Sequence, residues 1–146
     1  MYQGKSLIII PSYNEAENIV DIINDIIVKK ASFHVLVVDD NSPDKTYELV
    51  EEEIIKNPKK IFLIKRDKKS GLGTAYLEGF KWAIDNGYER IFEMDADYSH
   101  DPEDLLRMNV FLDNDGYDVV IGSRYISGVN VINWPIQRVL LSYFAS

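Results

Sequence analysis

The feature that most constrains this 146-residue chain is the alternation of short apolar runs with longer segments of helical periodicity. Continuous apolar runs are typical of strands buried on both faces, and strands that alternate with helices form parallel sheets. The pattern therefore predicts an α/β fold, a mainly parallel sheet with helices on both faces. The five expected strands are Ser6–Ile10, Val35–Asp39, Ile61–Lys65, Arg90–Met94 and Val119–Gly122.

Helical signals fill the gaps between these runs. Between residues 19 and 27, five isoleucines recur at a spacing that places them on one face of a helix. Asn14, with Glu17 three residues later, is a candidate cap for the start of that helix. A further helix is expected near residues 74 to 86, ending before Gly87 in a left-handed cap.

Two other helices are expected to begin at a capping residue followed by proline. The two pairs are Ser42-Pro43 and Asp101-Pro102. Proline fits the first helical position because its missing N–H group has no partner there in any case.

Length, charge and cysteine content exclude several classes of function. A chain of 146 residues predicts a single domain over residues 1–146. The absence of cysteine excludes disulfides, thiolate metal sites and a thiol nucleophile. The net charge of −8 disfavours nucleic acid as a partner, because phosphate backbones need clustered Lys and Arg. No leader or membrane-spanning run is visible, so a cytoplasmic location is expected.

Polar clusters follow four of the predicted strands, and ligands of open α/β sheets bind outside the carboxyl ends of the strands. The clusters are residues 11–15, 39–42, 95–97 and 123–124. Asp95 and Asp97 are two apart along a strand end, so their carboxylates are expected to point the same way. A hard divalent cation, Mg²⁺ or Mn²⁺, with a diphosphate as a further ligand, would offset their repulsion. The alternative is an acidic turn that caps the next helix.

Asp39 and Asp40 have the same position after another strand. One or both could accept hydrogen bonds from a base or a ribose. The alternative is that they cap the following helix, and the two roles can be divided between them. Glu15 has the same two interpretations. It could contact a ligand, or its negative charge could simply be favourable in the first turn of a helix.

Three further features could meet a phosphate. Gly71 and Gly73 precede a predicted helix, but the Walker lysine is absent and a tight turn fits equally well. The basic run at residues 65–69 is either a solvated loop or a phosphate contact. Arg124 follows the fifth run, where its planar fork of donors could bind an anion or pair with an aspartate.

In this order the strand-end motifs resemble family-two glycosyltransferases of the GT-A fold, most closely the polyprenol and dolichol phosphate mannose synthases. The segments that carry the resemblance are residues 10–19, 38–44, 71–76, 94–100 and 122–125. It extends from about Ser6 to Ser146 and implies a Rossmann-like nucleotide-diphospho-sugar transferase fold. Lys45 departs from the family, which usually has glycine there, and we expect that change to be tolerated.

The resemblance implies a role for each strand-end cluster. Asp97 and Arg124 would be catalytic, stabilising the departing nucleoside diphosphate. Asp95 and Asp97 would bind the metal, with Ser99 as a further candidate. The nucleotide sugar would be held by Pro11, Tyr13, Glu15, Val38, Asp40, Ala96 and Asp97.

The implied activity is metal-dependent, inverting transfer of mannose from GDP-mannose to a polyprenyl or dolichyl phosphate at the cytoplasmic face of a membrane. A lipid phosphate is already an anion near pH 7, so no strong general base is needed. Two alternatives stay open: another nucleotide sugar with a saccharide acceptor, and a nucleotide-sugar binding fragment without turnover. Nothing in the residues themselves fixes the base or the sugar.

The resemblance also implies that the chain stops after the donor and metal sites and before the acceptor side. We therefore expect a C-terminal truncation. The apolar tail from Val129 to Ser146 would then expose surface meant to be covered, and self-association through it is expected.

Overall fold

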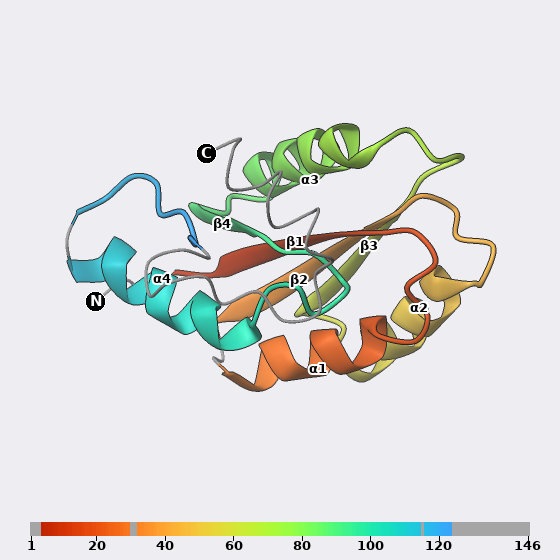
Figure 1. Ribbon diagram of the computed structural model, residues 1–146, viewed down its shortest axis with the longest axis horizontal. Helices are drawn as coiled ribbons and strands as arrows, with labels where there is room; N and C mark the ends of the chain where they lie inside the picture. Colours follow the sequence, from red (N-terminus) through yellow and green to blue (C-terminus); the bar gives the residue numbers. More distant parts are fainter. Residues whose placement is uncertain (1–3, 30–31, 115, 124–146) are drawn as a thin grey trace, which may run out of the picture.

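Four strands and four helices alternate along the described part of the chain, residues 4–29, 32–114 and 116–123, in a computed structural model (Figure 1). The strands are β1 (Ser6–Ser12), β2 (Phe33–Asp39), β3 (Ile61–Lys65) and β4 (Arg90–Glu93). The helices are α1 (Ile19–Lys29), α2 (Thr46–Lys56), α3 (Leu72–Asp85) and α4 (Pro102–Asn114). The alternation expected from the sequence is confirmed for these eight elements.

The four strands form one parallel sheet in the order β3-β2-β1-β4. Its register pairs Ser12 with Asp39 and Asp39 with Lys65, so three strands end at the same level. The loops that follow β1, β2 and β3 therefore leave the sheet side by side. This alignment brings their polar residues to one edge.

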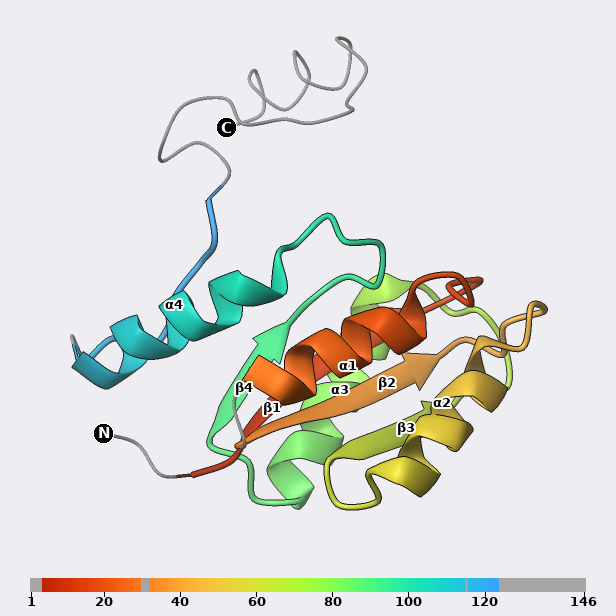
Figure 2. The same cartoon turned by 90° about the horizontal axis from the view of Figure 1, so that it is seen from below.

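Helices cover both faces of the sheet, as predicted: α3 lies on one face, and α1, α2 and α4 on the other (Figures 1 and 2). Side chains alternate along β1 accordingly. Ile8 and Ile10 pack into the core on the α1 side, whereas Leu7 and Ile9 pack into the core under α3. An ion pair between Lys29 and Glu103 joins α1 to α4.

Gly79 explains how closely α3 approaches the sheet. A Cβ atom at this position would lie 2.7 Å from the Cγ2 atom of Ile9, which is closer than real Cβ contacts. The absence of a side chain therefore lets the middle of α3 rest directly on β1. This contact fixes the helix whose first turn borders the site described below.

Two of the predicted helix starts are wrong, because both helices begin later and the two candidate capping residues make contacts in the preceding loops. The N–H of Asn14 donates to the Ser42 hydroxyl at 3.0 Å, and α1 begins only at Ile19. The Ser42 hydroxyl in turn donates to Asp39 at 2.6 Å, and α2 begins only at Thr46. Both candidate caps tie neighbouring loops together at the carboxyl edge of the sheet.

Lys45, the departure from the family pattern, is the residue before α2. Its φ of 64° lies in the left-handed region, which glycine adopts without steric cost. The lysine is accommodated there and forms an ion pair with Glu48 at 3.0 Å.

Two other helix ends agree with the sequence. The Asp101 carboxylate accepts the N–H of Glu103 at 2.9 Å, and Pro102 is the first residue of α4. Gly87 has a φ of 72°, and its N–H donates to the carbonyl of Ile84 at 3.0 Å just beyond α3. The predicted proline start and left-handed glycine cap are thus confirmed.

The fifth predicted strand is wrong within the described residues. Residues 119–122 do not form a strand, and the side chains of Val119 and Ile121 are 73% and 81% exposed. This segment runs away from the sheet after α4 (Figure 2), so its apolar residues have no neighbouring strand to pair with. Arg124 and the tail from Val129 to Ser146 lie outside the described residues, and the expected self-association stays a prediction.

None of the helices in the described ranges combines the length and the apolar character that a membrane crossing requires.

Candidate functional site

A cavity of about 280 Å³ opens at the carboxyl ends of the strands. The end of β1 and the loops after all four strands contribute to its lining, together with the first turn of α3. The lining residues are Pro11, Ser12, Tyr13, Glu15, Asp40, Lys69, Gly71, Leu72, Ala75, Asp95, Ala96 and Asp97. The strand-end residues predicted to act together are therefore brought to one cavity.

Two of the predicted site residues within the described ranges, Val38 and Ser99, are not among the lining residues of this cavity. Val38 is fully buried in the core under α3, so its side chain does not reach the cavity. Ser99 is exposed, and its N–H donates to the Asp97 carboxylate at 2.9 Å. Arg124 lies outside the described residues.

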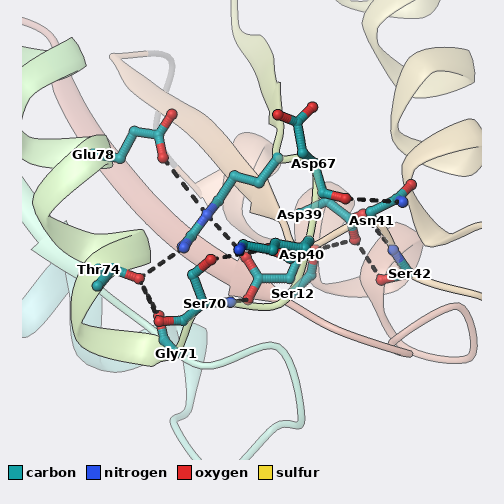
Figure 3. Close-up of polar contacts among 12 residues, drawn as sticks. Ser12, Asp39, Asp40, Asn41, Ser42, Asp67, Ser70, Gly71, Thr74 and Glu78 are labelled. Carbon is teal, nitrogen blue, oxygen red and sulfur yellow. Dashed lines mark hydrogen bonds and ion pairs between the residues drawn. The ribbon is translucent and has the colours of Figure 1, made fainter.

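The two aspartates after β2 have different surroundings (Figure 3). Asp39 is fully buried and accepts three hydrogen bonds, from the Ser12 hydroxyl at 2.8 Å and from the Ser42 hydroxyl and N–H at 2.6 and 2.9 Å. It therefore ties β1 to the loop before α2. Asp40 borders the cavity, so only this residue of the pair is placed to meet a ligand.

Asp40 is held by Arg66, a residue whose role the sequence did not reveal. The Arg66 Nε atom lies 3.1 Å from Asp40 Oδ1, and both side chains are 8% exposed. The basic run is therefore not simply a solvated loop. The register of the sheet explains why the two residues meet. Lys65 pairs with Asp39 at the ends of β3 and β2, and Arg66 and Asp40 are the residues that directly follow them.

The chain enters α3 through a glycine turn that borders the cavity. Gly71 has a φ of 95°, and Thr74 donates its hydroxyl back to the carbonyls of Ser70 and Gly71 at 2.9 and 2.8 Å. The lining residues Gly71, Leu72 and Ala75 place the N-terminal end of α3 at the cavity. That end of a helix favours an anion, because free N–H groups and the helix dipole both attract negative charge.

Asp95 and Asp97, after β4, form the more open acidic pair. Asp95 is partly buried, and its Oδ1 atom accepts the Tyr76 hydroxyl at 3.4 Å. Burial, together with the charges of Asp95 and Glu93, raises the pKa of Tyr76 well above its usual value. Tyr76 therefore stays protonated and acts as a donor to Asp95.

Asp97 is exposed and remains charged. Burial alone would raise the pKa of its carboxyl, but hydrogen bonds from the Ser99 side chain and backbone outweigh that effect and lower the pKa. The ring of His100 accepts the N–H of Asp95 through Nδ1 at 3.2 Å, so this nitrogen is already used. The other nitrogen, Nε2, lies 4.0 Å from Asp95 Oδ2, and the carboxylates of both Asp95 and Asp97 line the cavity.

The donor set fits a hard divalent cation that is completed by a ligand. In the described part of the chain, no group of three or more acidic or histidine side chains could hold a metal ion alone. Two carboxylates with substrate phosphates and water are the usual environment of Mg²⁺. The residues present therefore suit a cation that binds together with a phosphate-bearing ligand.

Glu15 adds negative charge at the same end of the cavity. Burial raises the pKa of its carboxyl against the lowering effect of Asn18, and the charges of Asp97, Asp44 and Asp95 raise it further. Among the described residues that line the cavity, Lys69 is the only cation, and its ammonium lies 3.8 Å from the centre of the Tyr13 ring. The cavity is therefore acidic near Asp95 and Asp97, and has an aromatic and a cationic side chain elsewhere.

A larger hollow, of about 380 Å³, lies at the opposite, amino-terminal edge of the sheet. Its buried His34 shares a hydrogen bond of 2.7 Å with the Tyr88 hydroxyl, and burial lowers the pKa of the imidazole. Glu89 is the single carboxylate among the lining residues that the structure describes. It lacks the paired carboxylates of the carboxyl edge, so the smaller cavity is the better candidate site.

Comparison with known proteins identifies a family and several relatives. Residues 7–145 match the family model described as glycosyl transferase family 2. The chain is 45% identical over 142 residues to polyprenol monophosphomannose synthase of Mycolicibacterium smegmatis, covering 97% of this chain and 53% of the relative. It is 39% identical over 140 residues to undecaprenyl-phosphate mannosyltransferase of Micrococcus luteus, covering 96% and 56%. The chain thus spans about half the length of these curated relatives.

Solved structures agree with this relationship. Staphylococcal (S. aureus) TarS 1-349 in complex with UDP-GlcNAc matches with a TM-score of 0.68 and 28% identity, covering 90% of this chain and 37% of that one. Mannosyltransferase PcManGT from Pyrobaculum calidifontis, in complex with GDP-Man and Mn²⁺, matches with a TM-score of 0.50 and 26% identity, covering 57% and 25%. The GT-A fold predicted from the sequence is confirmed by these neighbours and by the parallel sheet.

Proposed function

We propose, from the premise that this chain belongs to glycosyl transferase family 2, that it binds the nucleotide-sugar donor of a polyprenol phosphate mannosyltransferase. The observation that carries the proposal is the carboxyl-edge cavity, which gathers Asp40, Asp95 and Asp97 from two strand ends. Relatives named as polyprenol and undecaprenyl phosphate mannosyltransferases support mannose as the sugar. The donor is then GDP-mannose, and the acceptor a lipid phosphate.

The nucleoside binds at the side of the cavity formed by the loops after β1 and β2. Pro11 and Tyr13 supply flat apolar surface, while Glu15 and Asp40 supply acceptors for hydroxyl and N–H groups of the ribose and base. The pairing of carboxylates with such donors is a common means of fixing a nucleotide. Val38 contributes through the core that holds Asp40 in place, because its own side chain is buried there.

The diphosphate binds toward Asp95, Ala96 and Asp97. These two carboxylates would hold Mg²⁺ or Mn²⁺, and such a cation supplies charge stabilisation for the departing nucleoside diphosphate. Ser99 keeps Asp97 charged and oriented through its hydrogen bonds. Arg124 is assigned the remaining contact to phosphate from its place in the sequence.

The transfer is a single displacement with inversion. An oxygen of the lipid phosphate attacks the anomeric carbon, and the bond from that carbon to the diphosphate oxygen breaks, so the electron pair leaves with GDP. The attacking phosphate is already anionic near neutral pH, so the site needs no strong general base. Asp97 and Arg124 act on the leaving group rather than on the nucleophile.

Residues 1–146 supply the donor and metal side in this scheme. The chain spans about half the length of these curated relatives, and the proposal assigns no residue of the described ranges to the acceptor. The lipid acceptor places the reaction at a membrane surface, and the nucleotide sugar places it at the cytoplasmic face.

Calorimetric titration of GDP-mannose, with and without Mn²⁺, tests this proposal. Binding is expected only with the metal, and Asp97→Ala is expected to abolish this metal-dependent binding. Asp118→Asn, which removes an exposed carboxylate outside the cavity, is the matched control and is expected to bind like the parent chain. Metal-independent binding, or an Asp97→Ala variant that matches the parent, would rule out the proposed site.

A second candidate is transfer of another sugar to a saccharide. The observation in its favour is the higher TM-score of TarS with UDP-GlcNAc than of PcManGT with GDP-Man. Thermal shifts with GDP-mannose, UDP-glucose and UDP-N-acetylglucosamine, each with Mn²⁺, separate the two. A ligand bound by the folded state alone raises the melting temperature, and at equal ligand concentrations the tighter ligand gives the larger shift, so the largest shift identifies the donor.

A further inference from the structure

Two buried polar atoms beside the donor cavity have no hydrogen-bond partner. They are Oδ1 of Asp40 and Nη1 of Arg66. The two residues nevertheless form an ion pair, with Arg66 Nε 3.1 Å from Asp40 Oδ1 and both side chains nine-tenths buried. Buried polar groups nearly always make hydrogen bonds, so two atoms without one, in an ion pair that reaches the cavity through Asp40, call for a functional explanation.

Arg66 connects Asp40 to α3 on the other side. Its Nη2 donates to the Thr74 hydroxyl at 2.7 Å, and its Nε lies 3.6 Å from the Glu78 carboxylate (Figure 3). Thr74 and Glu78 belong to the first two turns of α3, whereas Asp40 directly follows β2. One guanidinium therefore spans the gap between the sheet edge and the helix.

The loop between β3 and α3 clamps the same carboxylate a second time. The N–H of Ser70 donates to Asp40 Oδ2 at 3.1 Å, so each carboxylate oxygen is held by one residue of this loop. Lys69, Gly71 and Leu72 on either side of Ser70 line the cavity. Arg66 thus influences both the orientation of Asp40 and the position of one cavity wall.

We propose that Arg66 is the positioning residue for the nucleoside end of the donor site, acting through Asp40 and through the 69–72 wall. This inference rests on the proposed function, because it assumes that a nucleotide occupies the cavity. Arg66 itself is not among the lining residues. Its effect is expected to be larger on the nucleoside than on the diphosphate, because none of the polar contacts described above joins Arg66 to Asp95 or Asp97.

The geometry requires arginine rather than any cation. A guanidinium is a planar fork that can serve Asp40, Thr74 and Glu78 at once, whereas the ammonium of lysine is a compact point charge on a flexible stem. Arg66→Lys therefore keeps the charge but loses the span. Thr74→Val removes one anchor of the fork and leaves the ion pair with Asp40 in place.

The test is calorimetric titration with two ligands in the presence of Mn²⁺: GDP, which carries the nucleoside, and inorganic diphosphate, which lacks it. Arg66→Lys is expected to raise the Kd for GDP at least about tenfold, because it loses the span between Asp40 and α3, and Thr74→Val a few-fold, because it loses one anchor of the fork. Neither variant is expected to change the Kd for diphosphate by more than about twofold. Arg107→Lys, an exposed arginine paired with Asp104, is the matched control and is expected to bind both ligands like the parent chain.

The outcomes separate this inference from the proposed function. Equal weakening of GDP and diphosphate in Arg66→Lys would indicate a merely structural role and would overturn the inference, and so would unchanged GDP binding. A parent chain that binds neither ligand would overturn the proposed function, and the inference with it. Arg66→Gln, which removes the charge, is expected to weaken GDP binding more than Arg66→Lys, and a smaller loss would contradict the positioning role.

Discussion

The acidic pairs after β2 and β4 share a sequence pattern but differ in their surroundings. Asp39 and Asp40 follow a strand that has neighbours on both sides, and the flanking loops supply the hydroxyl, N–H and guanidinium groups that satisfy them. Asp95 and Asp97 follow a strand that pairs only with β1 among the described residues, and they remain partly or largely open. The position of a strand in the sheet thus decides whether its terminal carboxylates organise loops or stay available for a cation.

The largest expected effect is on the free energy of unfolding, and it tests the difference between the two acidic pairs. Asp39→Ala removes the acceptor of three buried hydrogen bonds and leaves the donors of Ser12 and Ser42 unsatisfied. We expect a loss of about 3 kcal/mol or more in the free energy of unfolding, measured by chemical denaturation. Asp97→Ala, the matched change in the open pair, is expected to lose less than about 1 kcal/mol. Equal losses in the two variants would contradict the division of roles.

The next effect is on metal-dependent binding. Asp95→Asn keeps the shape of the side chain but removes half of the charge of the open pair. We expect the Mn²⁺ concentration for half-maximal GDP binding to rise at least about tenfold, followed by calorimetry, with little change in stability. Asp118→Asn again serves as the control. A variant with unchanged metal requirement would exclude Asp95 as a ligand.

The smallest expected effect is on how the free energy of unfolding depends on pH, and it concerns Glu15 at the acidic end of the cavity. Burial, reinforced by the charges of Asp97, Asp44 and Asp95, raises the pKa of Glu15 above 4.5. The folded chain then holds the proton of Glu15 more tightly than the unfolded chain does. The protonated carboxyl therefore contributes stability below pH 4.5, and this contribution is lost as the pH rises through the pKa of Glu15 in the folded chain.

Glu15→Gln should therefore be more stable than the parent at pH 7, by less than about 1 kcal/mol because solvent screens this side chain, and should lose that advantage below pH 4.5. Denaturation curves at pH 4 and pH 7 measure the difference. A variant that is less stable than the parent at pH 7 would show that Glu15 is held by partners rather than repelled by its neighbours.

Much of the fold could be predicted because strands buried on both faces appear as continuous apolar runs. β1, β2, β3 and β4 all agree with those runs to within two residues at either end. Residues 119–122 are the exception. Their apolar run has no partner strand among the described residues, so strand propensity without a neighbour does not produce a strand.

The candidate site could be located from the sequence because parallel strands bring their carboxyl ends to one edge. The details could not, since they depend on contacts between distant segments. Asn14 and Ser42 have the residue types of helix caps, but each is used in a bond between the loops after β1 and β2. Arg66 is hidden in a basic run, and only the register of β2 and β3 places it beside Asp40.

The most direct measurement of the central claim is the paramagnetic broadening of backbone amide signals when Mn²⁺ is added to the chain with GDP. A cation at the carboxyl edge is expected to broaden the signals of Asp95, Ala96 and Asp97 first. The signals of His34 and Tyr88, at the amino-terminal edge, are expected to stay sharp at the same Mn²⁺ concentration. Broadening that begins at the amino-terminal edge, or that does not depend on GDP, would contradict a metal-assisted donor site between β1, β4 and α3.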